Sequence, residues 1–287
     1  MVNLKAKPYC LSDEDIAWVE NTIAGMTDEE KVGQLFWQLT AGISEEYLKE
    51  LMEKYHLDRW NVINLFSMTR GINRFKGLAM ALGEIDQKYT PITGIAALQH
   101  WADTAPALSN DGVAKAAAEA TDPDAKLVLQ KALSWSKAVN AAIVELDEAL
   151  KVPYDGAKEG LAAAHQFADV AMVSSANRDA VEEEWGKFGL LDHTDIVLAQ
   201  DIGSKAACIK EMLKFGYDLD KVLMIGDAPG DCDAAEKNSV HYYPILVNHE
   251  KESWDEAIAI AFGKLQNGCY GEYGAEKKQV FLHNLGG

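Results

Sequence analysis

The C-terminal half of the chain alternates short apolar runs with segments of helical periodicity. Four apolar runs predict strands, at residues 169–175, 195–200, 221–227 and 243–247. A segment with apolar residues at helical spacing follows each run, at residues 178–188, 205–215, 232–237 and 254–265. Continuous apolar strands separated by amphipathic helices are typical of a parallel sheet covered on both faces. We therefore predict an α/β fold with a doubly wound parallel sheet, whose ligands bind at the carboxyl ends of its strands.

The region before this half has a different pattern. Residues 44–153 show helical periodicity almost throughout, and the longest helical pattern covers residues 124–150. Pro153 and Gly156 then mark the return to the α/β pattern. We predict an inserted all-helical domain at residues 44–153, ahead of an α/β core at residues 154–287.

The first 43 residues predict helices followed by one strand. Residues 13–23 have helical spacing, and the sequence T-D-E-E at residues 27–30 is a capping box that begins a second helix. Residues 34–42 then read as a buried strand that ends in a turn of small residues. We interpret residues 1–43 as N-terminal helices and the first strand of the core.

Charge and cysteine content narrow the class of protein. The net charge is −18, from 45 acidic and 27 basic side chains, which disfavours a nucleic-acid or anionic-membrane partner. The four cysteines have no C-x-x-C spacing, so neither a zinc site nor a disulfide framework is indicated. The chain has no apolar run of 18 residues and no signal-peptide profile, which predicts a cytoplasmic protein. The oligomeric state is not predictable from the sequence.

Polar residues follow three of the predicted strands, where a doubly wound sheet places its ligand. The residues are Ser174, Ser175 and Asn177 after the first strand, Lys205 after the second, and Asp227 and Asp231 after the third. A hydroxyl group and an ammonium group near helix N-termini suit phosphate oxygens. Carboxylates in a turn suit Mg²⁺, which usually takes one or two of them and keeps several waters. These residues predict a site for Mg²⁺ and a phosphate.

Each of these residues also has a structural interpretation. Ser174 after a strand is a common turn residue, and Lys205 alone is typical of a solvated helix. The pattern G-D-x-x-x-D, ending at Asp231, is also an acidic turn that caps a helix. Asp233 is interpreted as a solvent-facing helix residue. The order and spacing of the set favour the functional interpretation.

In this order the residues resemble the core of the haloacid dehalogenase superfamily, mostly phosphatases and phosphotransferases. Its second motif is a strand that ends in Ser or Thr, matched by Ser174. Its third is a Lys near the start of a helix, matched by Lys205, and its fourth is G-D-x-x-x-D, matched by Asp227 and Asp231. The resemblance implies that Ser174, Ser175, Asn177 and Lys205 bind the phosphoryl group of a small metabolite. It also implies that Asp227 and Asp231 hold Mg²⁺.

The resemblance also implies that the helical insert is a cap over the substrate. Within it, residues 67–77 place Arg70, Arg74 and Lys76 together in a strongly acidic protein. Arg70 is the candidate ligand for an anionic group of the substrate, and the alternative is a solvated basic face. Trp60, Phe66 and Phe75 are assigned to packing within the insert.

The superfamily's first motif, D-x-D-x-T after a strand, is absent from this sequence. That motif supplies a nucleophilic Asp and an Asp that acts as general acid and base. The best positional counterpart is residues 34–42, where Gln38 takes the nucleophile position, and a weaker one, residues 62–69, offers only Asn64 and Ser67. An amide does not attack phosphorus usefully. Because removal of a nucleophile costs on the order of 10⁶ in turnover in other covalent mechanisms, we expect hydrolysis to be lost or reduced by several orders of magnitude.

A second resemblance covers the start of the chain. Residues 18–36, with the run on to residues 53–56, are similar to the opening of family 3 glycoside hydrolases. Those enzymes are large barrels whose catalytic Asp lies beyond so short a segment, so glycosidase activity does not follow. The leading hypothesis is an impaired Mg²⁺-dependent phosphomonoesterase. The alternatives are an inactive phosphometabolite-binding protein, a glycosidase-related fragment and an interaction protein.

Overall fold

The computed structural model of the chain describes residues 12, 17, 58–88, 91–174, 176, 178–199 and 201–286. The chain divides into two compact units, Met1–Arg59 and Trp60–Gly287, and nearly all described residues belong to the second unit. Within the described ranges, no helix is both long and apolar enough to cross a membrane. The strand predicted at residues 34–42 lies outside the described residues, and the predicted domain boundaries stay predictions.

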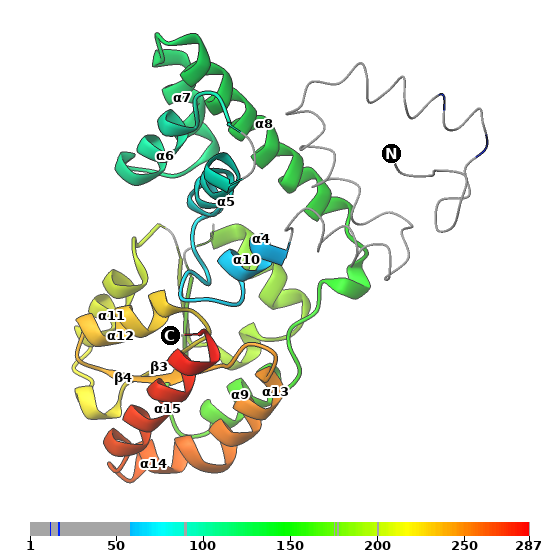
Figure 1. Cartoon of the computed structure of the whole chain (residues 1–287). Coiled ribbons are helices and arrows are strands. Elements are labelled where there is room, and N and C mark those ends of the chain that lie inside the picture. The colour runs from blue at the N-terminus through cyan, green and yellow to red at the C-terminus, as the bar shows by residue number, and fades with distance from the viewer. Residues whose placement is uncertain are drawn as a thin grey trace. The chain divides into compact units, whose positions relative to one another are not determined.

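Between residues 58 and 170 the described elements are all helices. They are α4 (Asp58–Asn64), α5 (Arg74–Lys88), α6 (Ile95–Thr104), α7 (Asn110–Glu119), α8 (Pro123–Glu145), the 3₁₀ helix η2 (Glu148–Leu150) and α9 (Ala157–Ala164). Figure 1 shows α5 to α8 grouped together, and we call these four the helical block. They enclose one core in which Phe75 packs edge-on against Trp101, with ring centroids 5.1 Å apart. The helical block therefore has a hydrophobic core of its own.

The strands and helices of the C-terminal half alternate as predicted. The strands are β1 (Ala171–Val173), β2 (Ile196–Leu198), β3 (Leu223–Gly226) and β4 (His241–Pro244). The α-helices are α10 (Arg178–Lys187), α11 (Lys205–Leu213), α12 (Pro229–Lys237), α13 (Glu250–Glu256), α14 (Phe262–Gln266) and α15 (Gly271–Asn284). Short 3₁₀ helices η3 (Leu191–His193) and η4 (Leu219–Lys221) precede β2 and β3, and the π-helix η5 (Ala257–Ala261) joins α13 to α14. The predicted α/β alternation is confirmed over these elements.

The strands form two parallel pairs. β1 pairs with β2, with Met172 opposite Val197, and β3 pairs with β4, with Ile225 opposite Tyr243. The predicted parallel pairing is confirmed, but within the described residues the pairs do not join into one doubly wound sheet. The reason is that no described strand lies between β1 and β3.

Two hydrophobic clusters cover the two faces of the β3–β4 pair. Tyr242 and Tyr243 are neighbours on β4, so their side chains point to opposite faces. Tyr242 packs with Phe281 of α15 in one cluster, and Tyr243 packs with Phe262 and Tyr270 in the other. This pair is therefore buried on both faces, as its continuous apolar sequence predicts.

Several predicted elements differ in extent from the observed ones. The helix predicted over residues 124–150 ends at Glu145, because Leu146 is extended and the Asp147 carboxylate begins η2 by accepting the N–H of Ala149. The strand predicted at residues 243–247 runs instead over His241–Pro244, the residues that pair with β3. The helices α9 and α15 have no counterpart among the predicted elements.

Of the three aromatic residues assigned to packing in the predicted helical region, two are confirmed and one is corrected. Phe66 is 40 % exposed, so it does not serve as a packing residue, whereas Phe75 is buried and Trp60 packs edge-on against Trp135. The weaker counterpart of the first motif, residues 62–69, is not a strand, because Asn64 is the last residue of α4.

Candidate functional site

The carboxyl end of β3 leads directly into the acidic turn. Asp227 follows the last strand residue, and Asp231 lies in the first turn of α12, where its Oδ2 accepts the N–H of Ala228 at 3.1 Å. The carboxylate of Asp231 packs against Gly226, where a Cβ atom would lie 2.4 Å from the Asp231 Cγ. Only a glycine at position 226 therefore leaves room for this carboxylate.

The main chain of this turn is also fixed from β4. The hydroxyl of Tyr242 donates a hydrogen bond of 3.0 Å to the carbonyl oxygen of Gly226. Burial raises the pKa of the Tyr242 phenol far above its ordinary value. The phenol therefore remains protonated and donates its hydrogen bond. This bond stabilises the backbone at Gly226, the residue before Asp227.

Lys205 and Asp231 form a buried ion pair. Lys205 is the first residue of α11, and its Nζ donates to Oδ1 of Asp231 at 2.5 Å. The Asp231 side chain is 2 % exposed and the Lys205 side chain 28 %. Removing one partner of a buried pair typically costs about 3 to 5 kcal/mol, because the other charge is left without compensation. The structure thus brings together two residues that the sequence placed 26 positions apart.

Arg70 is bound to Asp227. Its Nε and Nη2 donate to the same oxygen, Oδ2 of Asp227, at 3.0 and 2.6 Å, and its Nη1 donates to the carbonyl of Leu65 at 2.9 Å. The Arg70 side chain is 7 % exposed, so the solvated basic face is the wrong interpretation for this residue. Its predicted contact with a substrate anion stays a prediction. Arg74 points elsewhere and donates to Oδ1 of Asn140.

The other predicted residues are only partly described. Ser174 follows β1, its N–H donates to the carbonyl of Leu198 at 2.9 Å, and its Oγ accepts the N–H of Ala176 at 3.1 Å. Ser174 thus stabilises its own turn, and a role toward phosphate stays a prediction. The side chains of Ser175, Asn177 and Gln38 lie outside the described residues. Asp233 is exposed, as predicted.

The two described carboxylates of the predicted magnesium site both have cationic partners. Within the described part of the chain, no three His, Cys, Asp or Glu side chains lie together as metal ligands would. Each carboxylate that was predicted to hold Mg²⁺ is instead paired with a cation, Asp227 with Arg70 and Asp231 with Lys205.

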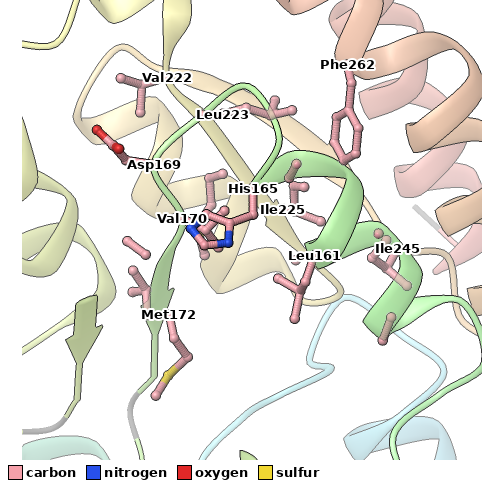
Figure 2. A pocket seen from close by; sticks show the side chains of 18 of the residues that line it. Leu161, His165, Asp169, Val170, Met172, Val222, Leu223, Ile225, Ile245 and Phe262 are labelled. Carbon is pink, nitrogen blue, oxygen red and sulfur yellow. The ribbon is translucent and has the colours of Figure 1, made fainter. Parts of the chain in front are cut away.

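A cavity of about 1040 Å³ borders this site. Arg70 and Asp227 line it, together with residues of β1, β3 and α9. Figure 2 shows the side chains of Leu161, Val170 and Ile225 around the space between these elements. The lining is mostly apolar.

The backbone edges of β1 and β3 face this cavity. Ser174 N–H bonds to β2, and the carbonyl of Gly226 bonds to the residue after β4. Residues of a parallel strand bond to its two neighbours alternately, so Ala171 and Val173 of β1, and Leu223 and Ile225 of β3, direct their N–H and C=O groups away from their partners. Within the described residues these two edges are unpaired. The described structure therefore contains no strand between the end of β1, beside Ser174, and the end of β3, beside Asp227.

Comparison with known proteins supports the resemblance over part of the chain. The family described as haloacid dehalogenase-like hydrolase matches residues 110–245, which include α7, α8 and all four strands. This match supports a haloacid dehalogenase-like hydrolase domain and the α/β fold that it implies. Hydrolases of this superfamily generally use Mg²⁺.

The start of the chain matches a different protein. A segment of 57 residues is 44 % identical to a β-N-acetylglucosaminidase/β-glucosidase of Cellulomonas fimi, which agrees with the predicted resemblance. This segment is 20 % of the chain but only 10 % of the glycosidase, so the chain spans a small part of that protein's length. No solved structure matches the chain.

The pairing of Arg70 with Asp227 is the feature of the site that sequence reasoning missed. The only signal for this pairing in the sequence is that residues 67–77 of an acidic protein contain three basic residues, one of which is Arg70. Because 157 positions separate the two residues, neither spacing nor periodicity indicates their contact.

Proposed function

We propose that this chain binds a small phosphorylated metabolite at the carboxyl ends of β1 and β3 through a phosphomonoesterase-type domain. We further propose that it hydrolyses the phosphomonoester very slowly or not at all. The substrate would meet the Ser174 hydroxyl, the Lys205 ammonium group and the Arg70 guanidinium group. Two cations and a hydroxyl group are suited to the oxygens of a phosphate.

One observation carries the proposal: each carboxylate at this edge of the described structure is matched by its own cation. Asp227 is held by Arg70 and Asp231 by Lys205. A cation bound to a carboxylate lowers its nucleophilicity, and both of these carboxylates are bound to one. In the sequence, the position that the superfamily uses for its nucleophile corresponds to Gln38, whose amide is a poor nucleophile.

The experiment combines a binding assay with a turnover assay on the full chain. We expect orthophosphate to bind, measured by calorimetry, and p-nitrophenyl phosphate to be hydrolysed at the background rate. Ser174→Ala should weaken phosphate binding. Ser109→Ala is the matched control, because Ser109 also accepts a backbone N–H, at the start of α7 in the helical block.

Two results would contradict the proposal. Absence of phosphate binding would remove the binding function. Turnover above background that disappears in Asp227→Asn would show an active enzyme.

If Gln38 takes the nucleophile position, Gln38→Asp should raise turnover, whereas Gln34→Asp, the same change four residues earlier, should not.

A further inference from the structure

The cation beside Asp227 belongs to a short segment, Leu65–Asn73, that joins α4 to α5. Both Nε and Nη2 of Arg70 donate to Oδ2 of Asp227, and Nη1 donates to the Leu65 carbonyl at the start of the same segment. Charge-assisted bonds of this kind are about twice as strong as those between neutral groups. The guanidinium group is therefore held at both ends, by the carboxylate and by its own loop.

The segment is ordered by hydrogen bonds of its own. The hydroxyl of Thr69 donates to the carbonyl of Ile63 at 2.6 Å and lies 2.9 Å from the hydroxyl of Ser67. The N–H of Arg70 donates to the carbonyl of Ser67 at 2.8 Å. The side chain of Arg70 is thus presented to Asp227 by a loop that has hydrogen bonds of its own.

A glycine lets this loop lie directly on the acidic turn. Gly71 has a φ of +74°, which is unfavourable for other residues. A Cβ atom at position 71 would lie 2.9 Å from the Cβ of Ala228, the residue after Asp227. The approach of the loop to the turn is therefore as close as the backbone allows.

Few carboxylate oxygens at this turn remain available to a metal. Arg70 takes Oδ2 of Asp227, Lys205 takes Oδ1 of Asp231, and the N–H of Ala228 takes Oδ2 of Asp231. Within the described part of the chain, Oδ1 of Asp227 is the oxygen left without such a donor. The Asp227 side chain is 49 % exposed, so water and ions reach it from outside.

From this geometry we infer that Arg70 is the built-in cation of the site and occupies Asp227 in place of a divalent metal. The charge of the turn is balanced without Mg²⁺, and Mg²⁺ binds Asp227 more weakly while the guanidinium group holds Oδ2. The inference concerns the same site as the proposed function and makes Arg70 the residue that sets its metal affinity. A bound cation repels a second cation at the same carboxylate, so removing Arg70 should strengthen metal binding.

The test is a calorimetric titration of the full chain with Mg²⁺ alone. We expect weak binding by the wild type, binding at least about tenfold tighter by Arg70→Gln, and loss of that gain in Arg70→Gln/Asp227→Asn. Arg74→Gln is the matched control. Arg74 lies four positions after Arg70, and its side chain bonds Asn140 and not Asp227. The control removes the same charge, so it should leave Mg²⁺ affinity unchanged.

A second variant keeps the test decisive if Arg70→Gln folds poorly. Arg70→Lys retains the positive charge but cannot donate two N–H groups in the same fork, so its Mg²⁺ affinity should lie between those of the wild type and Arg70→Gln. Circular dichroism shows whether each variant is folded.

Three outcomes would overturn the inference. They are equal Mg²⁺ affinity in the wild type and Arg70→Gln, a gain that survives Asp227→Asn, and no Mg²⁺ binding by any variant. Orthophosphate binding by the same proteins, measured without Mg²⁺, separates failure of this inference from failure of the proposed function.

Discussion

The two strand pairs of the C-terminal half are alike in pairing and unlike in surroundings. The β3–β4 pair has a hydrophobic cluster on each face, through Tyr242 and Tyr243, whereas the β1–β2 pair contributes no residue to the clusters of the described chain. The charged groups follow the same division. Asp227 and Asp231 stand at the end of β3, while β1 ends in Ser174, which bonds to its own turn. The two carboxylates of the site therefore follow the pair that is packed on both faces, whereas their cations come from other elements.

The largest expected effect comes from breaking the buried ion pair on the β3 side. Lys205→Met leaves the carboxylate of Asp231, 2 % exposed, with the Ala228 N–H as its remaining partner among the described residues. We expect the free energy of unfolding to fall by about 3 kcal/mol, the low end of the range for buried pairs, because Lys205 is partly exposed. Denaturant unfolding followed by circular dichroism measures this loss.

Lys210→Met is the control in the same helix. Lys210 is exposed, and we expect its substitution to change the free energy of unfolding by less than about 0.5 kcal/mol. Equal losses in both variants would show that the Lys205–Asp231 pair does not stabilise the β3 side.

A smaller effect is expected from filling the space that Asp231 uses. Gly226→Ala places a Cβ atom 2.4 Å from the Asp231 Cγ, so the carboxylate must move away from the strand. Overpacking of this kind typically costs about 1 to 3 kcal/mol. The loss is again measured by denaturant unfolding.

Gly230→Ala is the matched control for this change. A Cβ atom at position 230 meets nothing within 4 Å, and Ala is a better helix former than Gly, so this variant should be neutral or slightly stabilising. A loss in Gly230→Ala as large as that in Gly226→Ala would contradict the fitted contact between Gly226 and Asp231.

Features that depend on neighbouring residues could be predicted from the sequence. Contacts between residues far apart in the chain could not. The strand ends at Ser174 and Asp227, and the start of α11 at Lys205, follow from apolar runs that meet polar turns. The salt bridge between Arg70 and Asp227 joins residues 157 positions apart, and no periodicity encodes it. The separation of the two strand pairs among the described residues was also not predicted, because each apolar run looks the same whether it has one neighbour or two.

The most direct test of the account is hydrogen exchange of the strand amides, measured by NMR on the full chain. Among the described residues no strand lies between β1 and β3. This arrangement leaves the described part of the site without the strand that would carry a nucleophile. It predicts alternation: the amides of Met172, Ser174, Met224 and Gly226, which face a partner strand, exchange at least about tenfold more slowly than those of Ala171, Val173, Leu223 and Ile225. Equal protection of both sets would show that another strand pairs with these edges, and would contradict the account.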